Sequence, residues 1–245
     1  MSEAIVLFQF PRSKTVANVS FFCLKVETFM RITSIPFQIE ELFNPSKAPK
    51  GQLPFITHQE RTIPDSSHIL EYLKSKFSLT IDDDLIPEQI ATGHAVSIML
   101  EERLRWCIVY SRWLDDRYAP AMQNIFSEFV PSPLKIIFPL LCKQSRKRIT
   151  KALDLNGIGK FTPAEIYTFG QQDLTALTTI LGDKPYLFGD RPSSYDAVTY
   201  GFLANLIDVP IDCPLNTFAR DHQTLRDYCQ RMKNTYFSDL DQTDT

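Results

Sequence analysis

The sequence predicts a two-part protein, with a small α/β domain over residues 1–77 followed by an all-helical domain over residues 88–235. Before residue 78, short apolar runs of strand length alternate with helical periodicity. After Pro87 the strand patterns nearly vanish, and long helical patterns take their place. The stretch between the two parts is polar, is rich in aspartate and ends in a proline, which is typical of a linker.

The first part is predicted to form a β-α-β-β-α unit of thioredoxin type. Residues 5–10 form a compact apolar run, and residues 37–42 form a second one. Between them, residues 20–32 carry apolar side chains at helical spacing without an interrupting glycine or proline. Such a βαβ unit closes right-handed with parallel strands. A hairpin and a helix over residues 53–77 complete the unit.

The second part begins with two long helical patterns. The first spans residues 88–116, and the second spans residues 121–154, where several prolines disturb it. Two capping boxes then predict helix starts. One is formed by Thr162 and Glu165, and the other by Ser193 and Asp196. Both are structural features, and Gly201 in the last helix indicates a close helix–helix contact.

The composition excludes several classes of protein. The chain has 245 residues with a net charge of −3 and no basic stripe, so no nucleic-acid partner is expected. A basic run at residues 143–148 lies inside a helical pattern and is interpreted as a solvated face. The longest apolar stretch, residues 129–142, is too short and too interrupted by prolines for stable insertion in a membrane. A membrane-associated protein that uses this stretch is a further alternative, against which the prolines argue.

The cysteines indicate a reducing compartment. Five are present, an odd number, at scattered positions and without a Cys-x-x-Cys pair, which disfavours a disulfide framework or a zinc site. None of the four histidines has a partner at ligand spacing, so no metal site is expected. The first residues do not form a basic leader, which favours a cytoplasmic protein.

One motif points to a ligand site. Pro54 at the entry of an apolar run predicts a turn into an edge-side strand. If the Leu53–Pro54 bond is cis, the backbone groups of Leu53 point outward. Eleven residues after the proline, Asp65 and Ser66 stand where a helix should begin. An outward-facing amide beside a polar helix N-terminus suits an extended peptide with a carboxylate, although either residue also serves as an ordinary N-cap.

Five stretches together carry a family resemblance: residues 9–12, 22–28, 49–56, 157–159 and 188–196. In these stretches the chain resembles the failed-axon-connections branch of the glutathione transferase superfamily, which borders the metaxins. The resemblance implies a thioredoxin-like N-terminal domain, an all-α C-terminal domain and glutathione as co-substrate. Because the superfamily includes members without transferase activity, a non-catalytic metaxin-like binding or scaffold protein is the alternative.

The resemblance implies roles for individual residues of the glutathione site. Leu53 would pair through its backbone with the cysteinyl part of glutathione, and Pro54 would be the cis proline. Gln52, or Lys50 beside it, would meet the glycyl carboxylate.

Residues at two predicted helix N-termini would bind the γ-glutamyl end of glutathione and its thiol. Asp65 and Ser66 would hold the γ-glutamyl ammonium and carboxylate. Ser20 would stabilise the thiolate, in a Ser-x-x-Cys spacing that ends at Cys23. Ser20 serves equally well as a plain N-cap. Relatives often carry proline directly after this serine, where this chain has Phe21.

An electrophile pocket is expected between the domains. Its candidate lining residues are Phe10, Trp106, Tyr110, Trp113 and Tyr118, although aromatic residues at helical spacing are often ordinary core. The expected partner is a small-molecule electrophile, and a homodimer is a possible assembly. The reaction would be conjugation to, or reduction of, small electrophiles by the glutathione thiolate.

Overall fold

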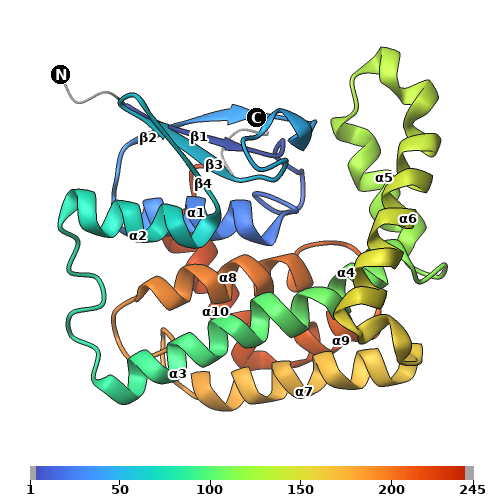
Figure 1. Ribbon diagram of the computed structural model, residues 1–245. Coiled ribbons are helices and arrows are strands. Elements are labelled where there is room, and N and C mark those ends of the chain that lie inside the picture. The colour runs from blue at the N-terminus through green and yellow to red at the C-terminus, as the bar shows by residue number, and fades with distance from the viewer. Residues whose placement is uncertain (1–3, 241–245) are drawn as a thin grey trace.

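The computed structural model describes residues 4–240 and shows a small sheet with two helices stacked on a larger group of helices (Figure 1). The first three residues, on which the expectation of a missing leader partly depends, lie outside the described residues. The sheet and its helices come from the first part of the chain, and the remaining helices come from the second. The thioredoxin-like plan followed by an all-helical part is therefore confirmed.

The sheet contains four strands in the order β2-β1-β3-β4. As predicted, β1 runs parallel to β2, while β3 is antiparallel to both β1 and β4. The expectation that Pro54 leads into an edge-side strand is wrong, because β3 lies between β1 and β4. Pro54 precedes the first residue of β3, where its missing N–H removes no ladder bond. The strands are β1 (Ile5–Gln9), β2 (Phe37–Glu41), β3 (Phe55–His58) and β4 (Arg61–Pro64).

Helices α1 (Phe21–Ile32) and α2 (Ser66–Phe77) lie on the face of the sheet that is turned toward the other helices (Figure 1). Leu7 and Ile56 from the sheet are fully buried against Phe29 of α1. The apolar stripe along each helix therefore faces this core. Because α1 is covered by the sheet on one side and by α8 on the other, almost all of its residues are buried.

The helical part follows the predicted pattern with two differences. Helical structure runs on from α3 into α4, but a π-helical segment (Met99–Leu104) interrupts the regular turns. The prolines near residue 132 separate α5 from α6 by a short 3-10 helix, as expected. Two further helices near the end, α9 and α10, were not among the predicted elements. The helices are α3 (Pro87–Ile98), α4 (Arg105–Trp113), α5 (Ala119–Phe129), α6 (Phe138–Asn156), α7 (Pro163–Leu181), α8 (Ser194–Ile207), α9 (Pro214–Asp221) and α10 (Gln223–Tyr236).

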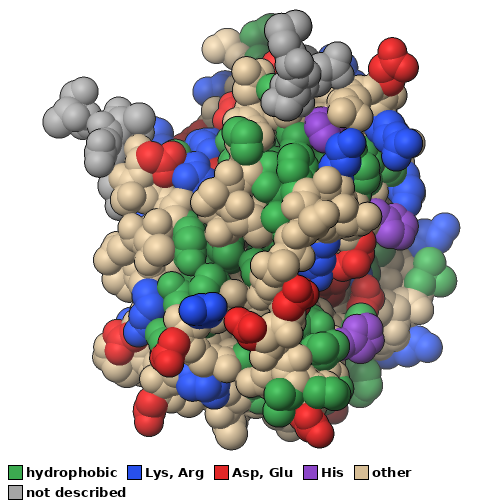
Figure 2. Space-filling model, turned by 90° about the vertical axis from the view of Figure 1, so that its left-hand side faces the viewer, with side chains coloured by type: hydrophobic (Ala, Val, Ile, Leu, Met, Phe, Trp, Pro, Cys, Tyr) green, Lys and Arg blue, Asp and Glu red, His purple; other side chains and the backbone are tan. Residues whose placement is uncertain are grey.

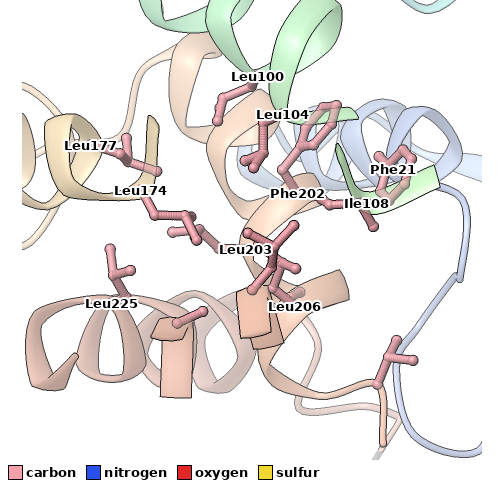
Figure 3. Packing of buried hydrophobic residues seen from close by; sticks show 14 of the residues in the cluster. Phe21, Leu100, Leu104, Ile108, Leu174, Leu177, Phe202, Leu203, Leu206 and Leu225 are labelled. Carbon is pink, nitrogen blue, oxygen red and sulfur yellow. The ribbon is translucent and has the colours of Figure 1, made fainter. Parts of the chain in front are cut away.

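Helix α8 packs directly against α1 and joins the two parts. The rings of Phe21 and Phe202 stack with centroids 4.8 Å apart, and Figure 3 shows them together at the edge of the larger core. Gly201 explains the close approach, because a Cβ atom there would lie 2.7 Å from the carbonyl oxygen of Phe21. The contact predicted for Gly201 is therefore confirmed, and its partner is the helix that begins next to Ser20.

The surface is mixed in charge where Figure 2 shows it. On this face, which includes α2 and the linker, acidic and basic side chains are interspersed. All five cysteines are buried and free. Within residues 4–240, none of the helices combines the length and the apolar character needed to cross a membrane.

Candidate functional site

A cavity of about 150 Å³ brings together residues that are far apart in the sequence. Most of its lining comes from the loop before β3, the N-terminus of α2 and the π-helical segment between α3 and α4, and Phe22 of α1 and Arg105 of α4 complete it. All six residues that the sequence assigned to a peptide-like ligand line it. They are Lys50, Gln52, Leu53, Pro54, Asp65 and Ser66.

The loop before β3 presents backbone groups to this cavity. The Leu53–Pro54 bond is cis, as the motif suggested. The Leu53 side chain is buried beside Cys23 and Phe55, which anchors the loop. Among the described residues, neither the amide nor the carbonyl of Leu53 has a backbone hydrogen-bond partner. An extended ligand can therefore pair with them in the manner of an added strand.

Asp65 sets the geometry at the start of α2. Its Oδ1 accepts hydrogen bonds from the amides of Ser67 at 3.0 Å and His68 at 3.2 Å, so it is the N-cap. Its backbone has a φ of +78°, which is unusual for aspartate and turns the chain sharply into the helix. Both cap bonds end on Oδ1, which leaves Oδ2 for a ligand ammonium. The adjacent Ser66 amide lies in the first turn, where an anion is favoured.

The π-helical segment supplies charged residues that sequence reasoning missed. Glu101 and Glu102 line the same cavity as Asp65, and so does Arg105, which directly follows this segment as the first residue of α4. Glu101 forms an ion pair with Lys25 of α1, with 2.7 Å between Oε1 and Nζ. A π turn adds one residue to the helical turn and so changes which side chains face a neighbour. The prediction of a helix over residues 88–116 assumed a regular helical periodicity, and this periodicity does not predict which side chains of the π-helical segment face the cavity.

Lys25 connects the three helices around the cavity. Its side chain is only 3 % exposed, and its Nζ donates to the hydroxyl of Ser67 at 3.0 Å as well as to Glu101. Burying an ammonium is costly unless it is paired and hydrogen-bonded, and here both conditions are met. Lys25 therefore fixes the N-terminus of α2 relative to α1 and the π-helical segment.

Ser20 is the N-cap of α1, and it does not line this cavity. Its Oγ accepts a hydrogen bond from the amide of Cys23 at 3.4 Å. The capping role is thus observed, while its role toward a ligand thiol stays a prediction. Cys23 is fully buried, and this burial raises the pKa of its thiol to about 12. Cys23 therefore lies one turn inside α1, away from solvent.

A second cavity, of about 790 Å³, lies next to the first and is largely apolar. Gly51 lines it, whereas the flanking residues Lys50 and Gln52 line the polar cavity, so one loop borders both. Its opposite wall comes from α5 and α6, which stand beside the sheet in Figure 1. The aromatic lining residues are Phe10, Phe43, Trp113, Phe126, Phe129 and Phe138.

Two of the five aromatic residues predicted for an electrophile pocket, Phe10 and Trp113, line this cavity. The other three do not line it, so for them a place at an electrophile pocket stays a prediction. Trp106, Tyr110 and Tyr118 pack against the large helical core instead. Aromatic residues within one helix point in different directions, and only those facing the loop before β3 reach the cavity. Within the described residues, no group of three or more metal-ligating side chains comes together.

Comparison with known proteins decides the family. Residues 21–118 match the glutathione S-transferase N-terminal domain, and residues 170–232 match the glutathione S-transferase C-terminal domain. The chain belongs to the glutathione S-transferase family. The first match runs past residue 77, where the predicted first domain ends, and includes α3 and α4, so the predicted boundary between the domains stays a prediction. It includes every residue named above for the polar cavity.

Relatives place this glutathione S-transferase family member in the branch of failed axon connections and the metaxins. It is 32% identical to Failed axon connections of Drosophila melanogaster over 98% of its own length, and it spans 60% of that longer protein. It is 28% identical to mouse Metaxin-1, with 97% and 76% of the two chains covered. It is also 29% identical to the isoprene-epoxide–glutathione S-transferase of Rhodococcus sp. (strain AD45), with coverages of 90% and 94%.

Solved structures show the same fold. A glutathione transferase from Phanerochaete chrysosporium superimposes with a TM-score of 0.65 at 14% identity and covers 97% of this chain and 99% of its own. A glutathione S-transferase of Ceriporiopsis subvermispora, solved in complex with glutathione, gives a TM-score of 0.63 at 17% identity, with 95% and 98% covered. At these identities the likeness concerns the fold alone.

Proposed function

We propose that this glutathione S-transferase family member binds reduced glutathione in the polar cavity and directs its thiol toward a small electrophile in the apolar cavity. The observation that carries the proposal is the convergence of the six predicted residues on one cavity that shares a loop with a second, aromatic cavity. We further propose that it acts in the cytoplasm, without a metal ion, and that it is able to form a homodimer.

The charges of the polar cavity suit glutathione, which carries two carboxylates and one ammonium. The Ser66 amide at the start of α2 favours the γ-glutamyl carboxylate, and Asp65 Oδ2 favours the neighbouring ammonium. Lys50 and Gln52 are exposed on the loop and are able to meet the glycyl carboxylate. The backbone of Leu53 pairs with the cysteinyl part, which brings the sulfur toward the N-terminus of α1.

The proposed chemistry is thiol addition or a glutathione-dependent reduction. In the addition reaction, the glutathione thiol gives its proton to solvent and its sulfur forms a bond to an electrophilic carbon. At the same time a π bond or a strained C–O bond of that carbon breaks, and the atom that receives its electron pair takes a proton from solvent. Ser20 uses its oxygen as an acceptor for the cap, and its O–H is the group that would donate to the thiolate of bound glutathione. Together with the N-terminus of α1, this hydroxyl would lower the pKa of the bound thiol.

Turnover with a broad panel of electrophiles and disulfides tests this function. Ser20→Ala should slow turnover by roughly 10–1000-fold while glutathione still binds, because one charge-stabilising donor is lost. Cys23→Ser is the matched control one turn further along α1, and it should leave the rate nearly unchanged. If Ser20→Ala keeps the full rate and Cys23→Ser abolishes it, thiol–disulfide exchange through Cys23 replaces the proposed mechanism.

The alternative is a non-catalytic binding or scaffold protein. Two observations favour it: Ser20 does not line the polar cavity, and the chain is similar to Metaxin-1 along most of its length. Absence of turnover on every electrophile and disulfide in the panel, in a protein that binds glutathione, would support this alternative.

A further inference from the structure

The α5–α6 region carries a strongly basic segment that the proposed glutathione chemistry does not use. Residues 129–153 contain no acidic residue, although the whole chain has a net charge of −3. All the charges in this segment are therefore positive, and they contrast with the mixed charges on the face that Figure 2 shows. The cations are Lys135, Lys143, Arg146, Lys147, Arg148 and Lys151.

Much of this charge lies in one row on the outside of α6. Leu140, Lys143, Lys147 and Lys151 follow one another at helical spacing, and all four are exposed. Within the described residues, Arg146 is the one cation of the segment with an ion pair, to Asp116 at 2.5 Å. The three lysines of the row thus have no ion pair with an acid among residues 4–240.

Two large aliphatic side chains are exposed where this row begins. Ile136 is 87% exposed and Leu140 is 66% exposed. Ile136 lies in the 3-10 helix between α5 and α6, and Leu140 lies in the first turn of α6. This end of the α5–α6 pair projects away from the rest of the helical part in Figure 1. An exposed aliphatic pair next to a row of lysines combines an apolar face with a cationic one, which is the pattern of segments that lie at a lipid interface.

We propose that the tip formed by Ile136 and Leu140, with the lysine row of α6 (Lys143, Lys147 and Lys151), docks on the surface of an anionic membrane. The two aliphatic side chains enter the headgroup region, and the lysines lie on the acidic headgroups. Charge complementarity selects this partner, because the segment has six cations and no acid. A nucleic acid would use the lysines but would leave the aliphatic tip in water.

Sedimentation with lipid vesicles tests the proposal on the full chain. The wild type should sediment with vesicles of about 30% phosphatidylserine in phosphatidylcholine, and not with pure phosphatidylcholine. Raising the salt concentration should weaken this binding. Lys143→Gln with Lys147→Gln should lower the partition coefficient by about 30-fold. Ile136→Asp with Leu140→Asp should lower it by about tenfold or more.

Each test variant has a matched control. The double variant with Lys76→Gln and Lys160→Gln is the control for the lysine substitutions, and Leu155→Asp is the control for the aliphatic substitutions. Both lysines are exposed outside the row, and Leu155 is 79% exposed near the other end of α6. These controls should bind vesicles as the wild type does, and all variants should keep the wild-type melting temperature. Light scattering of each variant adds a second readout. The proposal is overturned if the wild type fails to sediment with the anionic vesicles, or if the tip variants bind them normally. It is also overturned if the tip substitutions turn a dimer into a monomer, because this face would then be a contact between two copies of the chain.

Discussion

At the residue scale, Ser20 and Cys23 show how burial separates two groups that the sequence places one turn apart. Ser20 is partly exposed at the start of α1, whereas Cys23 is completely buried beside Leu53 and Phe55. The loss of solvent raises the pKa of the Cys23 thiol to about 12, although the Ser20 hydroxyl acts in the opposite direction. Of the two groups, only Ser20 is therefore accessible to solvent, and its role toward a ligand thiol stays a prediction.

Cys23 should resist alkylation in the native protein. With a pKa of about 12, its thiolate is a very small fraction of the thiol at about pH 8, and no solvent path reaches it. Iodoacetamide followed by peptide mass mapping should label Cys23 only after unfolding in guanidinium chloride. Rapid labelling of this residue in the folded chain near neutral pH would contradict the assignment of an inert thiol.

At the element scale, Asp196 does more than cap α8. Its buried carboxylate accepts from the Ser193 amide and hydroxyl, from the Leu187 amide and from the Tyr228 hydroxyl, all within 3.1 Å. Asp196→Ala leaves several buried donors without partners and should reduce the free energy of unfolding by about 3 kcal/mol or more. Urea unfolding measures the change, and glutathione affinity should stay nearly constant.

The opposite pattern would overturn this structural role. A variant with Asp196→Ala that melts at the wild-type temperature but no longer binds glutathione would place the carboxylate in the binding site. Glu165→Ala offers a comparison, because its capping box with Thr162 lies at an exposed helix start. Its loss should cost only about 1 kcal/mol.

The elements differ in how far the sequence predicts them. Capping boxes such as Thr162 with Glu165 are local patterns, and the structure has both of them. The π-helical segment is different, because residues 99–104 fit a regular helical period as well as the rest of their helix. The short helix α9 begins with a proline and spans only eight residues, too few for a clear periodicity.

The residues of the candidate site also differ in how far the sequence predicts them. The residues from the loop before β3 and from the start of α2 were predictable, because short motifs determine both turns. Glu101 and Arg105 were not, because their place at the cavity depends on how α3 and α4 pack against α1. Trp106 is the opposite case. Its spacing favoured a place in the electrophile pocket, but in the structure its side chain packs against the large helical core.

At the scale of the whole molecule, Gly201 controls how the two parts fit together. A Cβ atom at this position would lie 2.7 Å from the Phe21 carbonyl oxygen and 3.1 Å from the Lys25 amide, both backbone atoms of α1. Gly201→Ala should therefore push the helices apart and lower the free energy of unfolding by about 2–3 kcal/mol. Because Lys25 holds the π-helical segment at the cavity, glutathione affinity should fall as well.

Gly170→Ala provides the control for Gly201→Ala. Its Cβ atom would meet the Leu215 side chain at 2.6 Å, and this neighbour is a side-chain methyl rather than backbone. The cost should thus be smaller, and glutathione affinity should not change, since α7 does not border the polar cavity. Equal losses of stability in thermal unfolding of the two variants would argue against a special role for the α1–α8 contact.

The central claim is that the cavity at the start of α2 binds glutathione, and calorimetric titration of the full chain with reduced glutathione tests it most directly. The wild type should bind with a dissociation constant between micromolar and millimolar, roughly −4 to −8 kcal/mol. Asp65→Ala should weaken binding by about 1.5–3 kcal/mol, because a charged hydrogen bond to the ammonium is lost. Thr162→Ala, which removes a similar cap from α7, should bind as the wild type does. No detectable heat of binding at several millimolar glutathione, or unchanged affinity in Asp65→Ala, would contradict the account.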